Sequence, residues 1–215
     1  MLKLAPSILS ADFANLGSDI MLLDKAGADY IHIDIMDGVF VPNISLGLPV
    51  VRAIRKYTDR VFDVHLMLQD PGPYIEPMVR AGADLITIHL ESDGDIGAYI
   101  QQIRALGCRA GLAISPDTPL SDAAGLLPEL LLIMSVYPGF GGQKFIPTAL
   151  DKLREARKLI DAGRLRTELE VDGGVHWLNV ENIVRAGADV IVAGSLIFEG
   201  NTEENMYRLR GMVEA

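Results

Sequence analysis

The tetrapeptide Ala-Gly-Ala-Asp occurs three times in this chain, at 26–29, 81–84 and 186–189. Each copy follows a helix-like segment and precedes an apolar, strand-like one. The glycine suits the left-handed cap at the end of a helix, and the aspartate opens the next strand. The copies are spaced at close to two and four units of about 27 residues. Eight such units would fill the 215 residues, and eight is the number that closes a (β/α) barrel.

Apolar and amphipathic segments alternate along the chain in a number that agrees with eight units. We expect strands near 3–8, 30–34, 61–67, 85–89, 109–114, 130–134, 168–172 and 190–194. We expect helices near 13–26, 48–57, 73–81, 96–106, 119–126, 147–162, 178–187 and 202–213. The strands are continuous apolar runs, as in a parallel sheet that is buried on both faces. No linker is visible, so the prediction is an α/β fold, a single (β/α)8 TIM barrel domain over residues 1–215, with a doubly wound open sheet as the alternative.

Charge and composition exclude several partners. The net charge is −10, which argues against a nucleic-acid-binding surface. An anionic ligand would have to be held by backbone amides and helix N-termini. No run approaches the ~20 apolar residues of a membrane span, so no membrane partner is expected. Cys108 is the only cysteine, which indicates a reducing compartment, and we predict a cytoplasmic protein.

Four residues end or nearly end three of the predicted strands: His32, Asp34, His65 and Asp172. In a (β/α)8 barrel the active site lies at that end of the strands. Two imidazoles and two carboxylates are a complete donor set for one divalent transition metal, with zinc preferred and iron(II), manganese or cobalt as alternatives. Taken singly, each histidine could instead be structural and Asp172-Gly173 a simple turn. Their equivalent positions on three strands favour a functional cluster.

Two further histidines fit a metal site less well. His89 ends the fourth predicted strand, where it could support a ligand or be a buried structural residue. His176 lies in a loop beside Trp177, and we do not expect it to bind metal.

Three strand ends lead into loops of small residues. These loops contain Gly139, Phe140, Gly141 and Gly142, then Gly173 and Gly174, then Gly194 and Ser195. Glycine lets backbone N–H groups approach an anion, and the loops after strands seven and eight often bind phosphate in such barrels. Tight turns are the alternative. We also expect residues 138–143 to close over a ligand.

Three methionines, Met36, Met67 and Met134, fall at the same level as these loops. They are either core filler or an apolar collar around a reacting centre.

Six stretches, distributed in order along the chain, together form a specific sequence pattern. They are Ala5-Pro-Ser-Ile-Leu-Ser-Ala-Asp-Phe13, His32-Ile-Asp-Ile-Met-Asp-Gly38, Val41-Pro-Asn43, Asp63-Val-His-Leu-Met67, Met134-Ser-Val-Tyr-Pro-Gly-Phe-Gly-Gly-Gln-Lys-Phe145 and Val171-Asp-Gly-Gly174. Together they resemble the ribulose-phosphate 3-epimerase family.

The resemblance implies a metal-dependent isomerase of the pentose phosphate pathway that interconverts D-ribulose 5-phosphate and D-xylulose 5-phosphate. It implies that the four strand-end residues are metal ligands and that Asp34 and Asp172 are also the acid/base pair. It further implies a homodimer or homohexamer. By the same resemblance, contacts to the substrate or its phosphate come from Ser7, His65, Gly139, Phe140, Gly141, Gly142, Gly173, Gly174, Gly194 and Ser195.

The chemistry fits these residue types. A C2 carbonyl acidifies the proton on C3, and a metal on the C2 oxygen would stabilise the enediolate left when that proton departs. Inversion at C3 needs a proton removed from one face and returned to the other. Two carboxylates on opposite sides of the planar intermediate could do this.

The chain departs from the family pattern at a few positions. Tyr137 replaces the usual asparagine, Ser92-Asp93 replaces Ala-Thr, and the stretch 114–117 is also unusual. Tyr137 lies beside the predicted lid, where it could reshape the pocket around the sugar. Allulose-6-phosphate 3-epimerase activity is therefore an alternative. So are a non-catalytic sugar-phosphate-binding barrel and a metal-free decarboxylase or aldolase, although the latter would need a lysine at a strand end, and only Lys3 and Lys144 come near.

Overall fold

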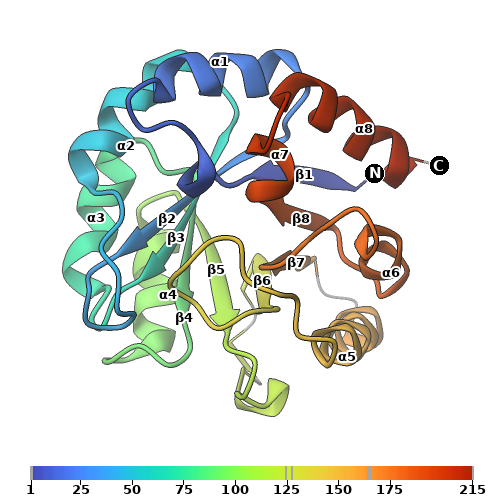
Figure 1. The fold of residues 1–215 in the computed structure, drawn as a ribbon. Helices are drawn as coiled ribbons and strands as arrows, with labels where there is room; N and C mark the ends of the chain where they lie inside the picture. Colours follow the sequence, from blue (N-terminus) through green and yellow to red (C-terminus); the bar gives the residue numbers. More distant parts are fainter. Residues whose placement is uncertain (1, 124, 127, 164–165, 215) are drawn as a thin grey trace.

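Eight parallel strands form one sheet that curls into a barrel (Figure 1). The computed structural model describes residues 2–123, 125–126, 128–163 and 166–214. Neighbouring strands follow the order β1-β8-β7-β6-β5-β4-β3-β2, and a parallel bridge between Ser7 and His32 joins the two end strands. The (β/α)8 prediction is confirmed. The strands are β1 (Lys3–Pro6), β2 (Tyr30–Met36), β3 (Val61–Met67), β4 (Leu85–His89), β5 (Arg109–Ile114), β6 (Leu130–Met134), β7 (Glu168–Asp172) and β8 (Val190–Ala193).

Helices surround the barrel and cover the outer face of the sheet (Figure 1). They are α1 (Leu16–Lys25), α2 (Leu48–Ile54), α3 (Gly72–Ala81), α4 (Ile96–Ala105), α5 (Ala149–Gly163), α6 (Val180–Arg185), α7 (Ser195–Phe198) and α8 (Thr202–Glu214). Short 3₁₀ helices lie at η1 (Ile8–Ser10), η2 (Arg55–Tyr57) and η3 (Leu120–Ala123). None of the helices in these ranges is long and apolar enough to cross a membrane.

The helix predicted at 119–126 is wrong, because only the four-residue η3 forms there; residue 124 lies outside the described residues. Pro116, Pro119 and Pro128 remove backbone donors from this connection, and Gly125 adopts a φ of 89°. Together they leave too short a stretch for an α-helix. The first strand also ends earlier than predicted, at Pro6, while β2 extends two residues further, to Met36. Helix α7 was not predicted.

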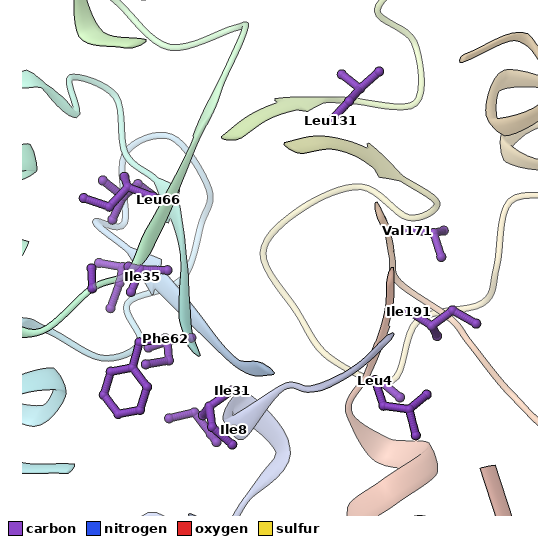
Figure 2. Close-up of a cluster of buried hydrophobic side chains, with 14 of the residues drawn as sticks. Leu4, Ile8, Ile31, Ile35, Phe62, Leu66, Leu131, Val171 and Ile191 are labelled. Carbon is purple, nitrogen blue, oxygen red and sulfur yellow. The ribbon is translucent and has the colours of Figure 1, made fainter. Parts of the chain in front are cut away.

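Alternate residues of each strand point to opposite faces, which gives the protein two apolar layers. Outward residues pack with helix residues in one large buried cluster, of which Figure 2 draws Leu4, Ile31, Phe62, Leu66 and Ile191 among others. Inward residues fill the barrel with a smaller cluster, including Ala5, Leu85, Leu130, Leu132, Val190 and Val192. Because both faces are buried, the strands read as continuous apolar runs.

The three Ala-Gly-Ala-Asp copies perform the same task at three strand starts. Their glycines end a helix with φ values of 85°, 113° and 101°. Their aspartates then accept a backbone N–H from an adjacent strand, as Asp84 does from Phe62 at 2.8 Å. Each aspartate also pairs with an arginine, and for Asp84 this is Arg55, again at 2.8 Å. The repeat therefore fixes the helix-to-strand corner on the side of the barrel opposite the predicted site.

Candidate active site and metal centre

The barrel brings His32, Asp34, His65 and Asp172 together, with one ligand atom from each lying within 4.8 Å of all the others. The first two are on β2, His65 is on β3 and Asp172 ends β7. The β2–β3 register places Asp34 beside His65. In the ring of strands, β2 and β7 are separated by β1 and β8, so the two aspartates approach the cluster from different sides.

Asp34 is the centre of the contacts in this cluster. Its Oδ1 lies 3.3 Å from His32 Nε2 and 3.2 Å from His65 Nδ1. Its Oδ2 accepts a hydrogen bond from Ser7 Oγ at 2.6 Å. Asp172 Oδ2 lies further out, 3.9 Å from His65 Nδ1. The atoms that face one another are thus His32 Nε2, His65 Nδ1 and carboxylate oxygens.

This arrangement fits a metal ion. Among the described residues, the buried Nε2 of His32 has no hydrogen-bond partner although it points at the cluster. A buried nitrogen without a partner is costly unless something else occupies its lone pair. Two imidazole nitrogens and two carboxylates are a donor set that transition metals accept. The cluster could therefore hold one divalent cation.

The two aspartates experience opposite environments. Burial raises the pKa of Asp34, but the neighbouring His32 and His65 outweigh it and hold that pKa below its usual range. Burial and the charge of Asp34 raise the pKa of Asp172 to about 7. Burial opposes charge on His32, yet the carboxylates of Asp63 and Asp34 raise its pKa well above the usual value. Two carboxylates with separated pKa values are what an acid/base pair requires.

Sequence reasoning missed two acidic residues beneath the cluster, Asp63 and Glu170. Both are fully buried and point into the barrel. His32 Nδ1 donates to Asp63 Oδ2 at 2.6 Å, and Glu170 Oε1 lies 3.3 Å from the same nitrogen. Burial and the charge of Asp63 raise the pKa of Glu170 well above its usual value. Asp63 and Glu170 each stand two residues before a predicted ligand, so the two-residue strand period could have identified them.

The structure places His89 directly behind His65, with the two rings stacked at a centroid distance of 5.0 Å. Of the two roles left open by the sequence, this contact favours support of a ligand. His176 lies apart, and its Nδ1 accepts the backbone N–H of Leu178 at 3.2 Å.

A cavity opens above the cluster at the carboxyl rim. Its lining includes Asp34 and Asp172 and most of the residues predicted to contact substrate: Ser7, Gly139, Phe140, Gly141, Gly142, Gly173, Gly174, Gly194 and Ser195. Met36, Met67 and Met134 are nearly fully buried and also line it. His65 is not in the lining, because it lies below the cavity floor with no exposed surface.

Loop 138–143 lies over this cavity and is held at both ends. Asn43 Nδ2 donates to Gly139 O at 2.8 Å, and Gln143 Nε2 donates to Tyr137 O at 2.6 Å. Gly174 supports the end of the loop from below, with a φ of 61°. A Cβ on Gly174 would lie 2.4 Å from the backbone nitrogen of Phe145. The short helix α7 begins at Ser195 on the same rim, which is where an extra helix often helps to bind phosphate in such barrels.

Tyr137 does not line the cavity. Its side chain is half exposed, and its hydroxyl donates to Asp117 Oδ2 at 2.9 Å. Two of the chain's departures from the family pattern therefore contact each other outside the pocket rather than reshaping it.

The parallel barrel, with two buried carboxylates and a cluster that could hold a metal ion under a glycine-lined cavity, places this protein in the class of (β/α)8 enzymes. Solved structures agree on the fold: KGPDC from Streptococcus mutans aligns over 100% of this chain and 98% of its own, with a TM-score of 0.74 at 15% identity.

The family model described as the ribulose-phosphate 3 epimerase family matches residues 3–198. The chain belongs to this family, and the resemblance seen in the sequence is confirmed; the protein is an isomerase. The ribulose-phosphate 3-epimerase of Synechocystis sp. is 50% identical over 198 residues, covering 90% of this chain and 86% of that protein. That of Bacillus subtilis is 43% identical over 215 residues, covering 98% of this chain and 99% of the relative.

Proposed function

We propose that this protein interconverts D-ribulose 5-phosphate and D-xylulose 5-phosphate by moving a proton at C3. The observation that carries the proposal is the convergence of Asp34 and Asp172 from separate strands on one cluster beneath the cavity. Relatives named ribulose-phosphate 3-epimerase over nearly the full chain support the choice of reaction.

In this proposal the aspartates serve opposite faces of C3. One carboxylate removes the C3 proton, and the other, in its protonated form, returns a proton to the far face. In the metal-free protein the depressed pKa of Asp34 favours its ionised form, while the pKa of Asp172 near 7 allows this carboxyl group both to give and to take a proton near neutral pH. In the reverse direction the two exchange roles. Ser7 holds Asp34 in place through its 2.6 Å hydrogen bond.

We further propose that one divalent metal ion, zinc in preference to iron(II), manganese or cobalt, is held by His32, Asp34, His65 and Asp172. When bound, it would supply Lewis-acid stabilisation of the negative charge that develops on the substrate. Asp63 would favour the His32 tautomer in which Nε2 is free to bind the metal, because its carboxylate accepts a hydrogen bond from Nδ1–H.

The rim residues bind and enclose the substrate. Backbone N–H groups of 139–142, 173–174 and 194–195 are placed to hold the phosphate, which offsets the repulsion expected from a net charge of −10. The loop at 138–143 excludes water when closed, and Met36, Met67 and Met134 keep the reacting carbon in apolar surroundings.

The alternatives named above are not favoured. Tyr137 lies outside the cavity lining, so it gives no reason to prefer a six-carbon sugar. Lys3, a lysine that an aldolase could have used, is instead bonded at the opposite end of the barrel to Tyr30 at 2.7 Å. A homodimer or homohexamer and a cytoplasmic location stay predictions.

The test is kcat/KM for D-ribulose 5-phosphate and D-allulose 6-phosphate, measured on metal-loaded protein and after chelation. We expect the pentulose to be preferred and activity to be lost on chelation and restored by added metal. Preference for allulose 6-phosphate would contradict the assigned substrate. Activity that survives complete metal removal would contradict the proposal that the reaction depends on a bound metal ion.

A further inference from the structure

His89 and Glu91 lie behind the metal centre and are not used by the mechanism described above. His65 Nε2 and His89 Nε2 are 2.9 Å apart, and His89 Nδ1 is 3.0 Å from Glu91 Oε2. His65 and His89 have no exposed surface. A continuous chain of hydrogen bonds therefore runs from the candidate ligand His65 to the carboxylate of Glu91.

The protons on this chain can be assigned from Glu91. Its Oε1 accepts the backbone N–H of Ser115 at 2.8 Å and the hydroxyl of Thr118, and Oε2 faces His89. These donors outweigh the effect of burial and lower the pKa of Glu91 to about 2, so it is an ionised acceptor. An ionised carboxylate can only accept, so His89 must carry its proton on Nδ1.

The position of the proton on His89 determines which nitrogen of His65 donates to it. With a proton on Nδ1, a neutral His89 presents a lone pair at Nε2. The 2.9 Å contact between the two Nε2 atoms needs one donor and one acceptor, so His65 donates from Nε2. Nδ1 of His65, which lies 3.2 Å from Asp34 Oδ1, is then the nitrogen left to bind a metal ion at the cluster.

We infer that Glu91, acting through His89, is a positioning residue that fixes His65 in the tautomer and orientation needed to bind the metal. This inference rests on the proposed metal-dependent function. It differs from the direct carboxylate support of His32 by Asp63, because here a second imidazole is interposed. Glu91 also holds the β5–η3 loop through Ser115 and Thr118, so its position is set by two parts of the barrel at once.

The test is the affinity of the metal-free, full-length protein for Co²⁺, measured by competition with a chromophoric chelator and by the visible absorption of the bound ion. Glu91→Gln removes the charge while keeping the shape of the side chain. We expect it to weaken Co²⁺ binding by about 10–100-fold, the usual effect of losing such a partner, and to shift the absorption bands. Thr118→Val is the graded comparison, because it removes one of the two donors to Glu91 Oε1 but leaves the charge of Glu91 and the His89 contact in place; its Co²⁺ affinity should fall less than that of Glu91→Gln.

His89→Phe supplies the second variant, since it keeps a ring in the stack but removes both nitrogens. If Glu91 acts through His89, adding Glu91→Gln to His89→Phe causes no further loss of affinity. Melting temperatures of the metal-free variants show whether each one folds.

Wild-type Co²⁺ affinity in Glu91→Gln, or losses that add in the double variant, would overturn the inference while leaving the metal site intact. Failure of the wild-type protein to bind Co²⁺ would overturn the metal site and this inference with it.

Discussion

Replacing Asp172 by Asn should separate the two proton transfers. The substitution keeps the shape of the side chain but removes the group that serves one face of C3. Loss of a positioned acid or base costs about 10²–10⁴-fold, and because nothing else described in the cavity can replace Asp172 we expect kcat to fall by about 10⁴-fold. This corresponds to about 5 kcal/mol of activation free energy.

The structure predicts that this loss is not caused by unfolding. Burial and the charge of Asp34 raise the pKa of Asp172 to about 7, so folding favours its protonated form. That contribution to stability is complete below the unfolded pKa and is lost as the pH rises through 7. Asparagine cannot ionise, so above pH 7 the metal-free Asp172→Asn protein should melt at or above the temperature of the wild type.

Hydrogen exchange in D₂O, followed by NMR, is the decisive assay for this variant. Asp34 remains, so one of the two epimers should exchange its C3 hydrogen with solvent while conversion to the other epimer is nearly abolished. Asp34→Asn should show the reciprocal pattern, with exchange from the other epimer. Metal content of each variant is the control. Exchange of the same epimer in both variants, or conversion at the wild-type rate in either, would refute assignment to opposite faces.

Other predictions concern the metal, the repeat and the lid. Because binding must displace the proton that Asp172 holds with a pKa of about 7, metal affinity should rise between about pH 6 and pH 8; calorimetry showing no proton release would contradict this. Asp84→Ala leaves the N–H of Phe62 without its 2.8 Å acceptor and should cost about 1–3 kcal/mol in urea unfolding; an unchanged midpoint would be inconsistent with the role given to the repeat. Gly174→Ala places a Cβ 2.4 Å from a backbone nitrogen at a φ of 61°, so strain of about 1–3 kcal/mol should lower kcat/KM. Gly211→Ala is the control, because a Cβ added at Gly211 meets no atom within 4 Å, and it should retain full kcat/KM. Equal kcat/KM in the two variants would contradict the role given to Gly174 in supporting loop 138–143.

The barrel could be predicted from the sequence because its determinants are local. Each Ala-Gly-Ala-Asp copy encodes a helix end and a strand start within four residues, and the positive φ at Gly27, Gly82 and Gly187 is what such a corner requires. The convergence of His32, Asp34, His65 and Asp172 followed from their level on the strands, because closure of the barrel brings equal levels together.

What could not be predicted depends on contacts between distant segments. The hydrogen bonds from His65 through His89 to Glu91 join two strands and the loop after the second of them. The orientation of Glu91 in turn depends on Ser115 and Thr118, which follow the next strand. The orientation of Tyr137 depends on Asp117, twenty residues away in sequence. Neither set of contacts joins residues at a regular sequence spacing, so neither can be recognised from a single sequence.

In the proposed reaction two carboxylates exchange the C3 proton of a ketose phosphate with solvent while inverting that carbon. The most direct measurement is to incubate metal-loaded wild-type protein with D-ribulose 5-phosphate in D₂O and to record the product by NMR. We expect D-xylulose 5-phosphate that carries deuterium at C3. A product that keeps its original C3 hydrogen, or the absence of any second epimer, would contradict the proposed reaction.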